Sequence, residues 1–148
     1  MKMKKLAKYL FSGLCAFLFA SCDVELSSHG NLYGYWHLES IDSIGSGTHV
    51  DMKDQLKFWA VQSRLIELSD HDWVYSPVIF HFDQVGDSLF LYDAHFNNRE
   101  TGDPELEGVW QVQVYGINSL SPRLRIDALT SGELTLSTRE VRMKLKKF

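Results

Sequence analysis

The chain has 148 residues, of which 45% are hydrophobic and 23% charged, and its formal net charge at pH 7 is −4. This length suits one domain and is too short for two ordinary ones. Because a net negative surface repels nucleic acid and anionic lipid headgroups, we expect neither of them as a partner.

Residues 1–21 have the pattern of a secretory signal peptide. An apolar run from Leu10 to Ala20 is shorter than the roughly 20 apolar residues that a membrane-spanning helix needs. A basic start, a short apolar core and small residues before a cleavage site are typical of a secretory signal. Cleavage would lower the net charge from −4 to −8, because it removes Lys2, Lys4, Lys5 and Lys8.

Cys22 follows this segment in the sequence FASC, which resembles the lipobox of bacterial lipoproteins. The resemblance implies cleavage before Cys22 and acylation of its thiol and its new amino group, and two or more acyl chains hold a protein stably on a membrane. We therefore predict a lipidated cysteine and tether at 22–31 and a place in the bacterial cell envelope, as an outer-membrane lipoprotein. The alternative is an ordinary signal peptide with a free Cys22 thiol. Cys15 is the other cysteine of the chain, so the mature domain would contain no disulfide.

From residue 32 onward, the main pattern is an alternation of apolar and polar residues between turn residues, which predicts β-strands. The segments 56–61 and 63–68 are either two strands or one bent strand, and Gly86 suits the turn of a hairpin. The polar stretches 69–77 and 94–108 are predicted loops. The other predicted strands are 35–41, 78–83, 88–93, 109–115, 123–128, 133–137 and 141–148.

The three C-terminal segments show the clearest alternation. They place on one face Leu124, Ile126 and Ala128, then Leu134 and Leu136, then Val141, Met143 and Leu145. Three short strands joined by tight turns form an antiparallel meander. About eight such strands suit a sandwich or a barrel, and a barrel leaves no exposed strand edges.

Gly34-Tyr35-Trp36, at the start of the first predicted strand, resembles the G-x-W motif that opens lipocalin-like, or calycin, barrels. The resemblance implies an all-β, about eight-stranded antiparallel meander barrel at residues 32–148, similar to small bacterial lipoproteins of uncharacterised function. It also implies that Trp36 plugs the closed end under a basic side chain of the last strand. Strand phase selects Lys147, where lipocalins usually have arginine; Arg139 has the right phase at the other end.

The sequence offers little for catalysis. None of the common hydrolase, metalloprotease or phosphate-loop motifs occurs among its residues. His81 and Asp83 lie two apart on one strand face, and a metal-assisted enzyme using them with a loop histidine is the weakest of three hypotheses. We expect no enzyme activity, no metal and no cofactor.

The aromatic residues carry the two stronger hypotheses. An eight-stranded barrel is either just filled by its own side chains or holds one small ligand. The first hypothesis is a binding module for a small apolar or amphipathic ligand, with Trp73 and Phe96 on loops at the mouth. The second is a structural lipoprotein with a filled barrel that docks another envelope protein, of unknown identity. The candidate ligand-binding residues are Trp59, Trp73, Phe80, Phe82, Phe96 and Trp110.

Overall fold

The computed structural model describes residues 30–148, which form a single antiparallel sheet of nine strands. The predicted signal peptide, Cys22 and most of the tether lie outside the described residues. The strands are β1 (Gly34–Ser43), β2 (His49–Asp51), β3 (Lys57–Gln62), β4 (Leu65–Asp70), β5 (Val78–Val85), β6 (Ser88–Phe96), β7 (Arg123–Leu129), β8 (Glu133–Ser137) and β9 (Val141–Lys147). Three short helical segments accompany them: η1 (Gly30–Leu32), η2 (Arg99–Thr101) and α2 (Trp110–Gln113).

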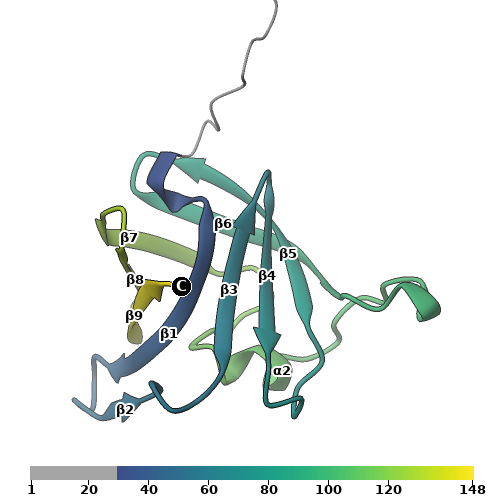
Figure 1. Ribbon diagram of the computed structural model, residues 1–148, viewed down its shortest axis with the longest axis horizontal. Helices are drawn as coiled ribbons and strands as arrows, with labels where there is room; N and C mark the ends of the chain where they lie inside the picture. The colour runs from purple at the N-terminus through teal and green to yellow at the C-terminus, as the bar shows by residue number, and fades with distance from the viewer. Residues whose placement is uncertain (1–29) are drawn as a thin grey trace, which may run out of the picture.

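The sheet closes into a ring, because β1 pairs with both β3 and β9 (Figure 1). From β3 onward, each strand pairs with the next one along the chain, and the short β2 pairs with the far end of β1. This arrangement confirms the predicted all-β antiparallel meander. The segments 56–61 and 63–68 are two strands, β3 and β4, joined by a tight turn at Ser63.

The predicted strand at 109–115 is wrong. Trp110–Gln113 is one helical turn, and the chain continues as a turn with Tyr115 and Ile117 buried. β6 and β7 pair over only three residues, so the segment between them crosses the end of the ring instead of lying in the sheet. Figure 1 shows α2 at that end, below β3 and β4. Trp110 is exposed there, which alternation along a strand would not have predicted.

The predicted inward position of Ala128 is also wrong. A shift of register between Ile126 and Ala128 places Ala128 opposite Thr135 and Leu129 opposite the buried Leu134. A β-bulge of this kind turns the side chains beyond it to the other face of the strand. Ala128 is therefore exposed, and Leu129 packs against the core.

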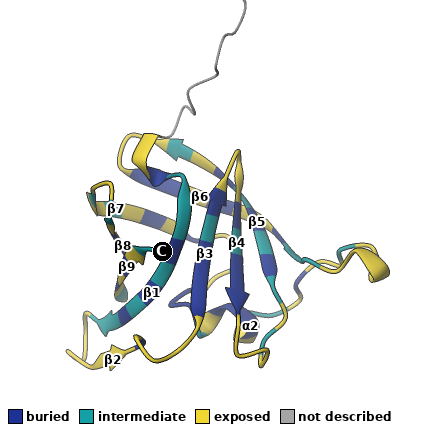
Figure 2. Cartoon of the chain, viewed as in Figure 1, coloured by how far each residue is buried: buried dark blue, intermediate teal, exposed yellow. Residues whose placement is uncertain are grey.

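The interior of the ring is filled by side chains. Trp36 and Trp59 are paired across β1 and β3, and both are buried together with Phe80 and Phe82 from β5 (Figure 2). Trp36, Phe80 and Phe82 have no surface that a water molecule could touch, and Trp59 has about 1%. Because internal cavities large enough for water would expose such surface, no water-sized space lies against these three rings.

One end of the ring is closed by η1 and the first residues of β1. The indole Nε1 of Trp36 donates a hydrogen bond to Leu32 O at 2.9 Å, and Lys147 Nζ lies 4.7 Å from the centroid of the indole ring. Gly34 has φ +143°, and a Cβ built on it would lie 2.4 Å from Lys147 Cε. The structure thus brings together Gly34, Trp36 and Lys147.

Candidate functional site

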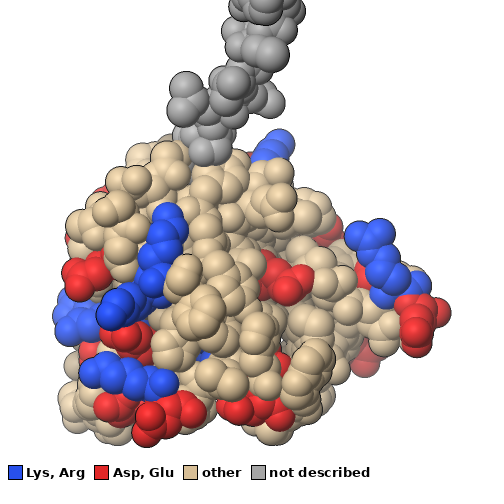
Figure 3. Space-filling view, viewed as in Figure 1, with Lys and Arg blue, Asp and Glu red and all other residues tan. Residues whose placement is uncertain are grey.

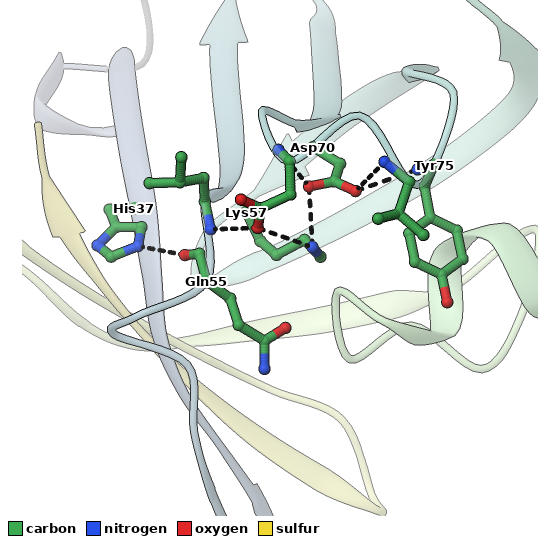
Figure 4. Close-up of polar contacts among 8 residues, drawn as sticks. His37, Gln55, Lys57, Asp70 and Tyr75 are labelled. Carbon is green, nitrogen blue, oxygen red and sulfur yellow. Dashed lines mark hydrogen bonds and ion pairs between the residues drawn. The ribbon is translucent and has the colours of Figure 1, made fainter.

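The opposite end of the ring carries a buried ion pair between neighbouring strands. Lys57 and Asp70 are opposite residues of β3 and β4, and strand alternation puts them on the same side as Trp59 and Leu68. Lys57 Nζ lies 2.8 Å from Asp70 Oδ1, and the two side chains are only 6% and 0% exposed. Buried charges of this kind are normally paired and hydrogen-bonded, and Figure 4 shows how this pair meets that need.

Asp70 also fixes the loop between β4 and β5. Its carboxylate accepts hydrogen bonds from the backbone N–H groups of Asp72, Val74 and Tyr75, each at 3.0 Å (Figure 4). Burial alone would raise the pKa of Asp70, but the bonds from Lys57, Asp72 and Tyr75 outweigh it and hold the pKa below its usual 3.8. The carboxylate is thus charged at neutral pH and anchors the loop.

Trp73 projects from this anchored loop into solvent. Its side chain is 86% exposed, its backbone has φ +61°, and the next residue, Val74, is exposed as well. Positive φ in a residue other than glycine costs about 1–3 kcal/mol. Trp73 is a large aromatic residue whose strained backbone is not offset by packing of its side chain, and exposed aromatic residues of this kind are typical of contact surfaces.

A cluster of rings adjoins the loop on the outer face of β1 and β3; we call Tyr35, His37, Phe58, His71 and Phe148 the outer aromatic cluster. Phe58 is its centre, with ring centroids 4.8 Å from Tyr35 and His71, 5.0 Å from His37 and 5.3 Å from Phe148. Tyr35 Oη and His71 Nε2 are 2.7 Å apart. His71 belongs to the loop that carries Trp73, so this loop connects the two features, and Figure 3 shows few charged side chains over β3 and β4.

The outer aromatic cluster could not be predicted from the sequence. The neighbours of Phe58, Lys57 and Trp59, point into the ring, so strand alternation places Phe58 on the outer face. It is nevertheless only 2% exposed. The rings that cover it come from β1, from the β4–β5 loop and from the C-terminal residue. Only the register of β1 with β3 and β9 brings them together.

Tyr115 lies buried near the anchored loop. Its hydroxyl has no hydrogen-bond partner among residues 30–148. Burial raises the pKa of this phenol well above its usual value, and the negative charges of Asp70 and Glu67 raise it further. Tyr115 is therefore a neutral phenol, and it contributes no charge to this end of the ring.

The predicted ligand-binding residues do not surround one common space. Trp59, Phe80 and Phe82 lie inside the ring, and Phe96 is partly buried against the core. Trp73 and Trp110 are exposed, in the β4–β5 loop and α2, which lie at the same end of the ring (Figure 1). Contact of these residues with a ligand stays a prediction.

The histidines and acids considered for catalysis pair in other combinations. Asp83 is bonded to Arg64, whereas His81 Nδ1 lies 3.0 Å from Asp93 Oδ2 and His95 Nδ1 3.4 Å from Asp93 Oδ1. Within residues 30–148, no three His, Cys, Asp or Glu side chains are grouped as ligands of a metal ion. The same part of the chain contains no helix long and apolar enough to span a membrane.

A closed antiparallel meander with a tryptophan under a basic side chain at one end defines a lipocalin-like protein. A family model described as a lipocalin-like domain matches residues 17–148, and the chain belongs to that family, which confirms the resemblance seen in the sequence. No curated protein matches the chain.

Two crystal structures share the fold. One is a lipocalin-like protein from Bacteroides uniformis, with 16% sequence identity and a TM-score of 0.60, matched over 80% of this chain and 100% of that one. The other is an uncharacterized protein from Bacteroides eggerthii, with 15% identity and a TM-score of 0.55 over 78% and 98% of the two chains. At these identities, the likeness concerns the fold alone.

Proposed function

We propose that the protein is a lipid-anchored, non-enzymatic binding protein of the bacterial cell envelope, which holds a small apolar or amphipathic ligand at the loop end of its barrel. The observation that carries the proposal is Trp73, an exposed aromatic residue in a strained backbone conformation on a loop fixed by a buried ion pair. The filled interior favours contact outside the ring. The outer aromatic cluster extends the apolar surface beside Trp73.

The proposed anchor is supported by the FASC sequence, which resembles a lipobox, and lipidated Cys22 would attach the protein to the outer membrane. The test is to express the full chain with a labelled fatty acid and to fractionate the cells. We expect label and membrane association for the wild type and for Cys15→Ser, whose cysteine lies within the signal peptide. Cys22→Ser should lose both. A Cys22→Ser protein that kept the label would exclude this residue as the attachment point.

The ligand site is tested on protein purified gently from the source cells. Native mass spectrometry should show a small mass that denaturation releases, and fatty acids should shift the emission of Trp73. Trp73→Ala and Val74→Ala should weaken fatty-acid binding at least fivefold. Val85→Ala removes an equally apolar exposed side chain from β5, and it should bind as the wild type does.

A second candidate function is docking of another envelope protein, which the filled interior also favours. A clean apo mass with no response to fatty acids and other apolar probes would refute the small-ligand proposal. Crosslinking from position 73 in intact cells would then identify a protein partner, if docking is the function.

A further inference from the structure

A second surface lies on the outer face of the ring, away from the anchored loop. The strand registers align Ser88 of β6, Arg125 of β7, Ser137 of β8 and Arg142 of β9 in one row across the sheet. Side chains opposite each other in such a row point to the same face and lie in contact distance. The row thus places Arg125 and Arg142 on the outside, on either side of Ser137.

A groove of about 740 Å³ lies over this row. Loops form its rim: Ile44 from the β1–β2 turn, Asn118, Ser119, Ser121 and Pro122 before β7, and Thr138 to Glu140 between β8 and β9. All of its basic lining residues are arginines, namely Arg123, Arg125, Arg139 and Arg142, and its acidic lining residues are Asp87 and Glu140. The groove is therefore locally positive in a chain whose net charge is −4.

Two of the four arginines already share a carboxylate partner. Asp127 lies between them, with its carboxylate 2.6 Å from Arg125 Nε and 3.4 Å from Arg142 Nε. Burial raises the pKa of Asp127, but hydrogen bonds from Arg125 and Ser137 outweigh it and keep the pKa below its usual range. This carboxylate stays charged and holds both guanidinium groups in place.

The other two arginines have no carboxylate partner among the described residues. Arg123 donates to Ser88 Oγ at 3.3 Å and lies 5.3 Å from the centroid of the Phe90 ring, which fixes its guanidinium without neutralising it. Arg139 makes no hydrogen bond or ion pair within residues 30–148. Both arginines line the groove, Arg123 from the first position of β7 and Arg139 from the turn between β8 and β9.

The two acids of the groove form no ion pair with Arg123 or Arg139 among the described residues. Glu140 accepts a hydrogen bond from Asn118 Nδ2 at 2.9 Å, and Asp87 accepts one from Ser88 Oγ at 3.5 Å. Two guanidinium groups that line one groove and have no carboxylate partner match the oxygen atoms of a phosphate or carboxylate, which accept paired hydrogen bonds from arginine.

We propose that this groove binds a small molecule carrying a phosphate or carboxylate group, held between Arg123 and Arg139, with its apolar part against Ile44. This site is separate from the one proposed at Trp73, and neither depends on the other. The same chemistry could be presented by a free phosphate ester or by an anionic lipid headgroup.

The test uses the full mature chain in detergent and NMR titration with phenyl phosphate, with phenol as the probe that lacks the anion. We expect phenyl phosphate to shift the amide signals of residues 118–125 and 137–142, and to bind more weakly as salt rises. Arg123→Gln and Arg139→Gln should each weaken binding at least fivefold. Arg99→Gln, an exposed arginine in η2, should bind as the wild type does, and so should Trp73→Ala.

Vesicles separate the two sources of the anion. The protein lacking its lipid anchor (Cys22→Ser) is mixed with vesicles of phosphatidylcholine alone or with one quarter phosphatidylglycerol. Binding to the anionic vesicles that requires Arg123 and Arg139 would assign the anion to a lipid headgroup, and binding of phenyl phosphate alone would assign it to a free molecule. If neither probe binds, or if both arginine variants bind like the wild type, the proposal is wrong.

Discussion

Replacing Lys57 by methionine tests the role of the buried ion pair most directly. Methionine keeps most of the volume and the apolar stem, but it leaves the carboxylate of Asp70, which is 0% exposed, without its cation. Breaking a buried pair by removing one partner costs about 3–5 kcal/mol. The three backbone N–H groups that still bond to Asp70 place the expected loss at the lower end, about 3 kcal/mol.

Urea unfolding followed by tryptophan fluorescence measures this loss. With an m-value of about 2 kcal/mol/M, the midpoint of Lys57→Met should fall by about 1.5 M. Lys53→Met changes an exposed lysine near the same end of the ring, and it should stay within about 0.5 kcal/mol of the wild type. Equal midpoints for Lys57→Met and Lys53→Met would refute the role given to the ion pair.

The pH dependence follows from the same pair. Because the pKa of Asp70 in the folded protein lies below its usual 3.8, its charged form stabilises the fold at all pH values above 3.8. This contribution is lost as the pH falls through the lowered pKa, where the folded protein takes up the proton. In Lys57→Met, burial still raises the pKa of Asp70 while the lowering effect of Lys57 is lost, so the variant takes up this proton at a higher pH than the wild type does. The stability difference between the wild type and Lys57→Met should therefore shrink as the pH falls from 7 through the acidic range. A difference that stays unchanged down to pH 2 would contradict this account.

Two further substitutions test the closed end of the ring by urea unfolding. Trp36→Ala should lower the free energy of unfolding by about 3–5 kcal/mol, because it empties a fully buried position. Trp110→Ala, at an exposed position, should lower it by less than about 1 kcal/mol, and similar losses for the two variants would exclude Trp36 as the plug. Gly34→Ala should lower the free energy of unfolding by more than about 1 kcal/mol, because the added Cβ would meet Lys147 and the φ of Gly34 is positive. Gly45→Ala is the control, since a Cβ there meets only open space. A Gly34→Ala protein as stable as the wild type would refute the close contact.

Most strands could be predicted from the sequence, because one face of each is buried and the other is exposed to solvent. β8 and β9 show this directly: Leu134, Leu136, Met143 and Leu145 are buried, as the alternation predicted. β2 was missed because its three residues are all exposed and so leave no alternation to detect. Ala128 was misplaced because a bulge changes the phase of a strand without a clear mark in the sequence.

The candidate site was less predictable, since its parts meet only in the folded ring. Lys57 and Asp70 are thirteen residues apart and look like ordinary surface charges in the sequence, but the register of β3 with β4 places both side chains inside the ring. The segment at 109–115 alternates like a strand, and short apolar runs of this kind do not distinguish strand from helix. Trp73 could be singled out because a tryptophan that follows two acids, Asp70 and Asp72, in a loop has no evident packing role.

The packing of the barrel decides where a ligand can bind at low cost. Admitting one inside would displace rings such as Trp59, Phe80 and Phe82, and each loses about 1.5–3 kcal/mol when it leaves a buried position. Moving three of them would oppose binding by about 5–9 kcal/mol, which is as large as the whole binding free energy of a micromolar ligand, about 8 kcal/mol. Covering Trp73 has the opposite sign: an aromatic side chain buries about 150–250 Å², which contributes about 4–6 kcal/mol at 25 cal/mol per Å². A ligand that covers the loop end therefore gains free energy from a surface that is already exposed, and it leaves the core intact.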